Sequence, residues 1–289
     1  MKLSLNRLVL LLMVALTAAS ASGCGAVNRI RAKNALNEGA RAYKDGRFDE
    51  AEQKFRSARE LDPDQKNAPL FIARAVHQQY KPGVDTPENK EKADRAVEAY
   101  KQVLAAPGIE EKHREDAYSA IAYIYRQMRE EKKEEEWLTQ RANSGDAPPA
   151  KRSDAYTILA SKQWDCAYNI NEQKESKKTI DKGDKGIVVE YVKPKNPDDF
   201  NKAMGCVDRG LDLVNRAIEQ NKDNPNAWSY KTNLLRERAK LAQMDGKPED
   251  KARFDSEANA AEQEQKRLNA AANQKKADED AKKTPPAAS

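Results

Sequence analysis

The chain has 289 residues, of which 38% are hydrophobic and 34% charged, and its formal net charge is +5. Its mean hydropathy of −0.97 excludes a protein built mainly from membrane-spanning helices. Basic and acidic residues are interspersed nearly everywhere, which predicts a solvated helical surface and argues against a nucleic-acid-binding face. Abundant alanine, glutamate, lysine and arginine, with only 6% aromatic residues, favour an all-α protein with a thin core.

The amino terminus has the three parts of a bacterial export signal. Lys2 and Arg7 supply positive charge, residues 8–18 (LVLLLMVALTA) form an apolar run, and small residues follow up to Cys24. The apolar run is too short to span a bilayer, so residues 1–23 are predicted to be a signal peptide.

The end of this signal resembles the bacterial lipobox, in which small residues precede a cysteine that becomes lipidated. The match lies in Ala21-Ser22-Gly23-Cys24, although the family pattern favours leucine where this chain has Ala21. The resemblance implies an acyl anchor on Cys24, with residues 24–34 as a short tether. Gly25 replaces the aspartate that favours inner-membrane retention, so the resemblance implies a periplasm-facing place on the outer membrane. Ordinary cleavage after Ala21 is the alternative, and it would give a soluble periplasmic protein.

Residues 35–65 (ALNEGARAYKDGRFDEAEQKFRSARELDPDQ) resemble the tetratricopeptide repeat (TPR), a helix–turn–helix unit of about 34 residues. The positions that carry the resemblance are Gly39, Tyr43, Gly46, Phe48, Ala51, Phe55, Ala58, Leu61 and Pro63. Gly39 and Ala51 are small where two helices would cross closely, and Gly46 suits the left-handed conformation that ends a helix. The pattern therefore predicts a helix pair.

Capping signals set the expected helix boundaries. Asp49 is placed to cap the second helix, with Glu52 in capping-box spacing behind it. Asp62-Pro63 is expected to end that helix, because proline cannot donate the next backbone hydrogen bond. Farther along the chain, Asn224-Pro225 gives an N-cap followed by proline at the first helical position.

Weaker helical periodicity predicts four more pairs, at about residues 66–107, 113–143, 151–220 and 224–268. The predicted fold class is an all-α, TPR-like superhelix of antiparallel helix pairs over residues 35–268. An irregular helical bundle is the alternative, because only the first repeat is specific. Leu268 is the last large apolar residue, so residues 269–289 are predicted to be a polar, disordered tail.

The fourth pair carries an insertion at residues 170–198. Within it, Thr179-Ile180 and residues 187–192 (IVVEYV) flank the turn-forming residues 181–186 (DKGDKG), which predicts a β-hairpin. An isolated hairpin is marginally stable in water, so it is expected to rest on the helices or on a partner.

Two cysteines flank the insertion, Cys166 near the end of one helix and Cys206 near the start of the next. These positions would face each other in an antiparallel pair, and export makes a disulfide chemically plausible. The bond would close a loop of about 40 residues and stabilise the fold by about 4 kcal/mol in the chain-entropy model. Two unpaired buried thiols are the alternative, and the spacing is unlike a redox-active C-x-x-C pair.

The sequence offers no recognisable reaction chemistry. The two histidines, His77 and His113, fall in different predicted pairs, with no cysteine or carboxylate at metal-ligand spacing. A phosphate-binding loop, a dinucleotide-binding glycine motif and a G-x-S-x-G motif are all missing. We therefore predict a protein that is not an enzyme and that uses no cofactor and no metal.

The TPR resemblance implies that the first helices of the pairs line a concave binding surface. Candidate surface residues, taken from matching repeat positions, are Tyr43, Lys44, Tyr123, Arg126, Trp164, Asn233 and Arg236. For Tyr43, Tyr123 and Trp164, burial in the core between repeats is the alternative. The favoured hypothesis is a membrane-anchored scaffold for an unknown protein or peptide partner in envelope assembly or secretion, without nucleic acid. The alternatives are an enzyme or carrier with a site at the insertion, and a purely structural envelope protein.

Overall fold

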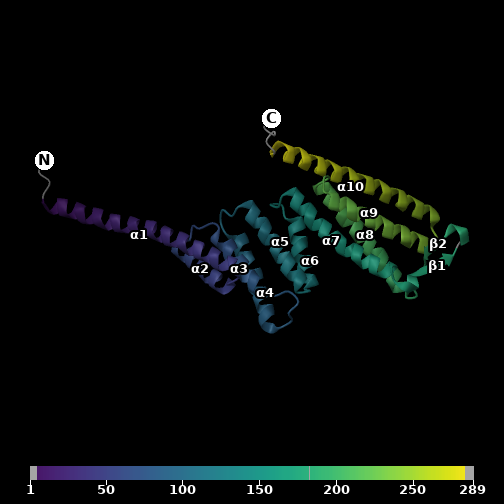
Figure 1. Ribbon diagram of the computed structural model, residues 1–289, viewed down its shortest axis with the longest axis horizontal. Coiled ribbons are helices and arrows are strands. Elements are labelled where there is room, and N and C mark those ends of the chain that lie inside the picture. The colour runs from purple at the N-terminus through teal and green to yellow at the C-terminus, as the bar shows by residue number, and fades with distance from the viewer. Residues whose placement is uncertain (1–4, 182, 284–289) are drawn as a thin grey trace, which may run out of the picture. The chain divides into compact units, whose positions relative to one another are not determined.

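The computed structural model describes residues 5–181 and 183–283 and consists almost entirely of helices (Figure 1). Within these residues, ten α-helices and one two-stranded antiparallel sheet follow one another along the chain. The chain divides into two compact units, Met1–Glu134 and Glu135–Ser289, and each is considered by itself. The predicted all-α fold of TPR-like antiparallel helix pairs, with a small hairpin in the fourth pair, is confirmed.

Unit 1 contains the first two pairs, the first helix of the third pair and the start of its second helix. Its helices are α1 (Leu5–Lys44), α2 (Phe48–Leu61), α3 (Ala68–Gln79), α4 (Pro87–Ala105), α5 (Glu111–Gln127) and the first turn of α6 (Glu131–Asn143). Neighbours in the chain pack side by side, α1 on α2, α2 on α3, α3 on α4 and α4 on α5. This is the stacking of consecutive hairpins that the repeat pattern predicts.

The first pair packs as the repeat signature predicts. A Cβ atom on Gly39 would lie 2.6 Å from the ring of Phe55, so α1 and α2 approach each other too closely for any side chain at this position. Ala51 of α2 is completely buried. Gly46 has a φ of +75°, in the left-handed region that favours glycine, and α2 ends before Asp62 as expected.

The predicted capping box of α2 is wrong. Asp49 lies inside the first turn, because the helix begins at Phe48 and Arg47 occupies the N-cap position without a side-chain cap. Glu52 is buried instead, and accepts hydrogen bonds from Gln79 of α3 at 2.7 Å and Arg95 of α4 at 3.0 Å. Its carboxylate is therefore used to join three helices and is not available to cap one.

The amino-terminal part of α1 runs without a break through the backbone of the predicted signal, Cys24 and the predicted tether. Residues 1–4 of that signal lie outside the described residues. Across residues 5–181 and 183–283, none of the helices is both long enough and apolar enough for a membrane crossing.

Unit 2 contains the remaining helix pairs and the hairpin. After α6 come α7 (Pro149–Asn171), β1 (Lys177–Asp181), β2 (Ile187–Tyr191), α8 (Pro197–Gln220), α9 (Pro225–Met244) and α10 (Pro248–Lys283). The predicted cap of α9 is confirmed, because the Asn224 side chain accepts from the backbone N–H groups of Asn226 and Ala227. The same side chain donates to Ser153 of α7 at 2.9 Å, so the cap also ties two helices together.

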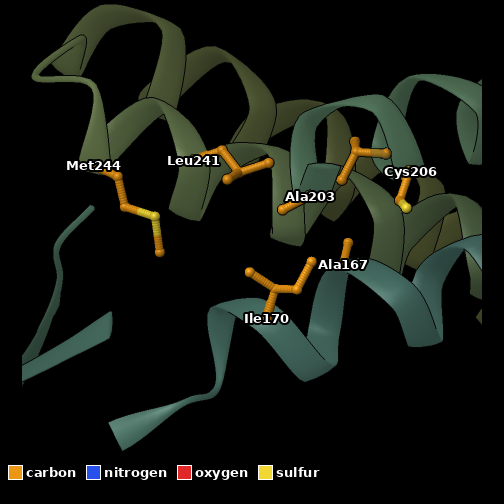
Figure 2. Close-up of a cluster of buried hydrophobic side chains, with 7 residues drawn as sticks. Ala167, Ile170, Ala203, Cys206, Leu241 and Met244 are labelled. Carbon is orange, nitrogen blue, oxygen red and sulfur yellow. The ribbon is translucent and has the colours of Figure 1, made fainter. Parts of the chain in front are cut away.

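Small and branched side chains fill the core where α7, α8 and α9 meet (Figure 2). The cluster consists of Ala167, Ile170, Ala203, Cys206, Val207, Leu241 and Met244. A second close approach lies nearby, where a Cβ on Gly210 would come within 2.5 Å of Leu234. Alanine and glycine at these positions let the helices pack closely enough to exclude water.

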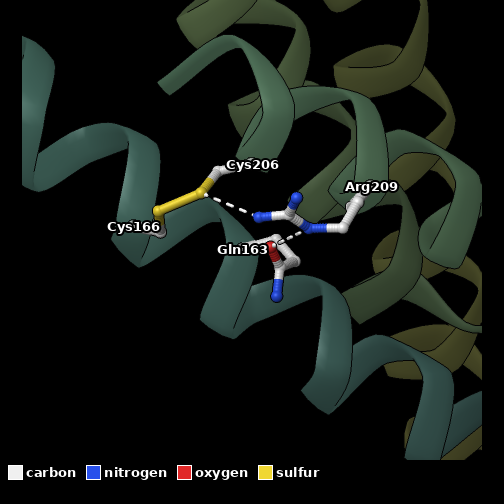
Figure 3. Close-up of a disulfide and its surroundings, with 4 residues drawn as sticks. All are labelled: Gln163, Cys166, Cys206 and Arg209. Atoms are coloured by element: carbon white, nitrogen blue, oxygen red, sulfur yellow. Dashed lines mark hydrogen bonds between the residues drawn. A yellow bond between two sulfur atoms is a disulfide. The ribbon is translucent and has the colours of Figure 1, made fainter. Parts of the chain in front are cut away.

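The predicted disulfide lies beside this core. The sulfurs of Cys166 in α7 and Cys206 in α8 are bonded, and the two Cα atoms are 6.1 Å apart (Figure 3). Arg209 packs against the bond, with Nη2 3.4 Å from the sulfur of Cys206 and Nε donating to Gln163 at 3.2 Å. The bond closes the loop that carries the hairpin.

The hairpin forms as predicted, with Thr179 opposite Val189 and Asp181 opposite Ile187. It rests on the helices at its Tyr191 end, which packs against the core cluster. The other end carries an exposed apolar run, in which Ile187 is 71% accessible.

The carboxyl-terminal segment differs from the prediction. The sequence predicts a disordered tail from residue 269, whereas α10 continues to Lys283 and residues 269–282 are all exposed. Alanine, glutamine, glutamate and lysine have high intrinsic helix propensity and nothing in the segment interrupts the helix, so it extends without a buried face. Residues 284–289 of the predicted tail lie outside the described residues.

Candidate protein-binding surface

The first helices of the pairs in unit 1 carry a small apolar hollow. It has a volume of about 180 Å³ and is lined by Ala40, Tyr43, Lys44, Phe55, Phe71 and Arg74, which come from α1, α2 and α3. The rings of Phe55 and Phe71 form its floor, with centroids 5.4 Å apart. Two larger hollows in the same unit are lined by residues of loops and helix ends, several of them charged. The apolar one is therefore best suited to receive a hydrophobic side chain.

Two cationic side chains lie at the edge of this hollow. Lys44 is exposed in the last turn of α1, where a positive charge also interacts favourably with the helix dipole. Arg74 of α3 is partly neutralised by Asp116 of α5, at 2.8 Å. The hollow therefore combines an apolar interior with a positive edge.

Aromatic side chains continue this surface from α3 to α5. The ring of His77 lies 5.7 Å from that of Tyr100 and 6.0 Å from that of Tyr123. Nδ1 of His77 and the hydroxyl of Tyr100 share a hydrogen bond of 3.3 Å, and burial lowers the pKa of His77 and raises that of Tyr100. Both groups are therefore neutral near pH 7 and support Tyr123, which is 45% exposed.

Arg126 lies one turn beyond Tyr123 on α5. Its guanidinium donates to the buried carboxylate of Glu134 at 2.8 Å, while half of the side chain remains exposed. Glu134 thus holds the Arg126 guanidinium in place at the surface.

In unit 2 a second aromatic group lies where α7 meets α9. The ring of Trp164 is 5.1 Å from that of Tyr168, one turn along α7, and 6.0 Å from that of Tyr230 on α9. Tyr168 is 40% exposed, and Lys240 lies 5.5 Å from its ring centroid. This group holds the two first helices of unit 2 together and leaves one ring accessible.

A network of charged side chains lies beside Tyr168 at the root of the hairpin, where its strands join the helices. Glu172 accepts hydrogen bonds from Lys240 at 2.7 Å, Tyr191 at 2.8 Å and Lys177 at 2.9 Å. Burial opposes the charged form of Glu172, but these hydrogen bonds outweigh it and lower its pKa to about 2. Burial likewise opposes the charge on Lys240, and bonds to Glu172 and Glu237 raise its pKa. The charges satisfy one another, so this network fixes the hairpin.

The structure distributes the seven candidate surface residues over both units. In unit 1, Tyr43 and Lys44 line the hollow, while Tyr123 and Arg126 follow on α5. In unit 2, Trp164 joins the aromatic group and Asn233 is half-buried on α9. Arg236 lies on the side of α9 that faces α10, where it pairs with Glu262 at 2.6 Å.

Sequence reasoning missed several residues of these surfaces, namely Phe71, Arg74, His77, Tyr168 and Tyr230. Tyr168 had a detectable signal, because it lies four residues after Trp164 and so on the same side of a helix. The others come from degenerate repeats, where no residue at a known position marks the surface.

The described residues contain no group of three histidine, cysteine or acidic side chains arranged to hold a metal ion. His77 is hydrogen-bonded within the aromatic row, and His113 lies 4.0 Å from Glu110, the residue that precedes its helix. The arrangement of unit 1 offers apolar contact, ring stacking and positive charge, which are the means of binding a polypeptide.

No protein-family model matches the sequence, and no curated protein matches it. Among solved structures, MamA is similar over 82% of this chain and 94% of its own, with 12% identity and a TM-score of 0.38. PilF of Pseudomonas aeruginosa is similar over 78% and 90%, with 11% identity and a TM-score of 0.35. The TPR2AB domain of yeast Sti1, in complex with pHSP90, is similar over 81% and 98%, with 12% identity and a TM-score of 0.32.

Similarities this low transfer no residue role or partner to this chain. What the helix pairs themselves define is a class: a helical-repeat protein with TPR-like antiparallel pairs, interrupted by one hairpin.

Proposed function

We propose that this protein is a membrane-anchored, periplasm-facing scaffold that binds a protein or peptide partner through the first-helix surface of unit 1. The observation that carries the proposal is the apolar hollow of about 180 Å³ with Lys44 and Arg74 at its edge. A hollow of this size accepts one large apolar side chain, and the exposed ring of Tyr123 adds a second anchoring point. The partner segment we expect is extended, with one buried apolar residue.

The membrane anchor is a lipid on Cys24, which the lipobox resemblance supports. Cleavage before Cys24 would remove residues 1–23 and leave Gly25 as the second residue, which favours the outer membrane. Intact-mass measurement of the protein from the membrane fraction tests this part. A chain that starts at Cys24 with acyl groups is expected, and an unacylated chain that starts at Ser22 would contradict it.

A photocrosslinking experiment tests the binding surface. A photoreactive phenylalanine analogue at Tyr123 is expected to capture a defined protein in cells, because this ring is exposed on α5 in the aromatic row that continues from α3. The same analogue at Gln53, which is exposed on α2, serves as the matched control. Equal capture from the two positions, or capture from neither, would count against a binding surface at this place.

A site at the hairpin insertion is the weaker alternative. At the hairpin root, Lys177, Lys240 and the hydroxyl of Tyr191 all donate hydrogen bonds to Glu172. These groups are therefore engaged in holding the hairpin and not in receiving a substrate, so we favour the scaffold function.

A further inference from the structure

The first turns of α1 that follow Cys24 carry only positive charge. Arg29, Arg31 and Lys33 occur here, and the first acidic residue after Cys24 is Glu38. All three cations are exposed, and their side chains form no ion pair with any described residue. Elsewhere the chain intersperses the two signs of charge, so this segment is unusual for it.

Two exposed apolar side chains belong to the same turns. Val27 is 46% accessible and Ile30 is 64% accessible, whereas Ala32 and Ala35 are buried against the rest of unit 1. At about 100° per residue, Val27 and Ile30 lie together on the side of the helix away from those two alanines. Arg31 and Lys33 lie on either side of the apolar pair in the same helical projection.

We propose that residues 27–33 of α1 lie against an anionic phospholipid surface, with Val27 and Ile30 between the head groups and Arg31 and Lys33 beside the phosphates on either side of them. The inference rests on the proposed lipid anchor, which would hold Cys24 at the bilayer. With a rise of about 1.5 Å per residue, Val27 lies about 4.5 Å and Arg31 about 10 Å from Cys24 along the axis. Val27 is therefore within one Debye length of the anchored end, about 8 Å at physiological salt, and Arg31 is just beyond it.

Charge complementarity indicates that an anionic bilayer contacts this segment. A cation close to an anionic bilayer strengthens binding about fivefold, so Arg31 and Lys33 together are expected to favour the membrane-apposed state by about 25-fold. Two apolar side chains contribute too little to hold an unanchored chain, so the segment orients a protein that the lipid already tethers. A partner protein at this surface is the competing occupant, and it would give no dependence on lipid charge.

Vesicles that carry the purified lipidated protein provide the test. Asn34 is exposed on the same side of α1 as Ile30, and Asn34→Cys introduces the free thiol for a polarity-sensitive fluorophore. Cys166 and Cys206 are joined in the disulfide, and Cys24 carries the lipid. The label is expected to be shielded from aqueous iodide in vesicles with 30% phosphatidylglycerol and accessible in pure phosphatidylcholine.

The variant Arg31→Gln/Lys33→Gln is expected to lower the ratio of shielded to accessible label about 25-fold, as is 1 M salt. A label at Gln53→Cys serves as the control, and it is expected to stay accessible in both membranes. Equal iodide access at position 34 in charged and neutral vesicles would overturn the inference. Intact mass is measured first: an unacylated chain contradicts the anchor itself, whereas an acylated chain with an accessible label contradicts only the inference.

Discussion

The first and the fourth helix pairs are closed in different ways. In the first pair, α1 and α2 are joined by a turn of three residues and approach closely at Gly39 and Phe55. In the fourth pair, a long segment that contains the hairpin connects α7 to α8. A disulfide and a charged network at the hairpin root hold that pair together.

The comparison shows what an insertion requires. Closing a longer loop costs more chain entropy, and the cost grows slowly with loop length. In the first pair, the residues of the repeat itself are enough to stabilise the short turn. The fourth pair, which the hairpin interrupts, adds a covalent bond and ion pairs to its apolar packing. The two pairs should therefore respond differently when each kind of contact is removed.

Removal of the disulfide should have the largest effect. The double variant Cys166→Ala/Cys206→Ala is expected to lower the free energy of unfolding of unit 2 by about 4 kcal/mol. Without the bond, the unfolded chain is no longer closed into a loop of about 40 residues and has a higher conformational entropy. Hydrogen exchange, read separately for α7–α8 and for α1–α2, checks this. Equal loss of protection in both pairs would contradict a local role for the bond.

The charged network should follow. Glu172→Gln is expected to lower the stability of unit 2 at pH 7 by about 2 kcal/mol, because Lys240 loses its charged partner in a partly buried place. The pKa of Glu172 is lowered to about 2 in the folded protein. Its contribution is therefore complete above its ordinary pKa near 4.5 and is lost as the pH falls towards 2.

Denaturant unfolding at several pH values checks this contribution. The parent should lose more stability than the Glu172→Gln variant between pH 4.5 and pH 2. Identical acid profiles for the two proteins would show that Glu172 does not carry this stabilisation.

The close approach in the first pair gives a smaller effect. Gly39→Ala is expected to destabilise unit 1 by about 1–2 kcal/mol. The added Cβ would overlap the Phe55 ring, and the energetic cost of this overlap exceeds the gain in helix propensity from glycine to alanine. The double variant Gly39→Ala/Phe55→Leu should show a coupling that recovers part of this loss relative to the sum of the single variants. A stabilising Gly39→Ala would contradict the packing.

The cap of α9 should contribute least. Asn224→Ala removes the cap and the hydrogen bond to Ser153, and a loss of about 1 kcal/mol is expected. Thermal unfolding measures it, with Asn226→Ala as the control because Asn226 is an exposed neighbour in the first helical turn. The account predicts a clear difference between the two variants.

Local signals in the sequence were enough to predict most of the fold. The helix pairs, the turn at Gly46, the cap at Asn224 and the hairpin each depend on residues that are neighbours in the chain. The capping box at Asp49 failed because Glu52 is used by two other helices, a contact that no local pattern encodes. The helical end of α10 was not predicted, because its residues have enough intrinsic helix propensity to stay helical without a buried face.

The candidate surface was less predictable for the same reason. Tyr43 and Lys44 belong to the one specific repeat and were found, whereas Phe71 and Arg74 line the same hollow from a degenerate repeat. Their role depends on how α3 packs against α1 and α2, and this packing is a property of the folded unit and not of any segment.

The central claim is that the hollow in unit 1 receives an apolar side chain of a partner, and filling the hollow tests it most directly. Ala40 is exposed at its wall, so Ala40→Phe should occupy the space without disturbing the core. Crosslinking of the partner through Tyr123 should fall at least tenfold in this variant. It should not change in Ala150→Phe, where an exposed alanine of α7 is replaced. Undiminished crosslinking in a folded Ala40→Phe protein would contradict the claim.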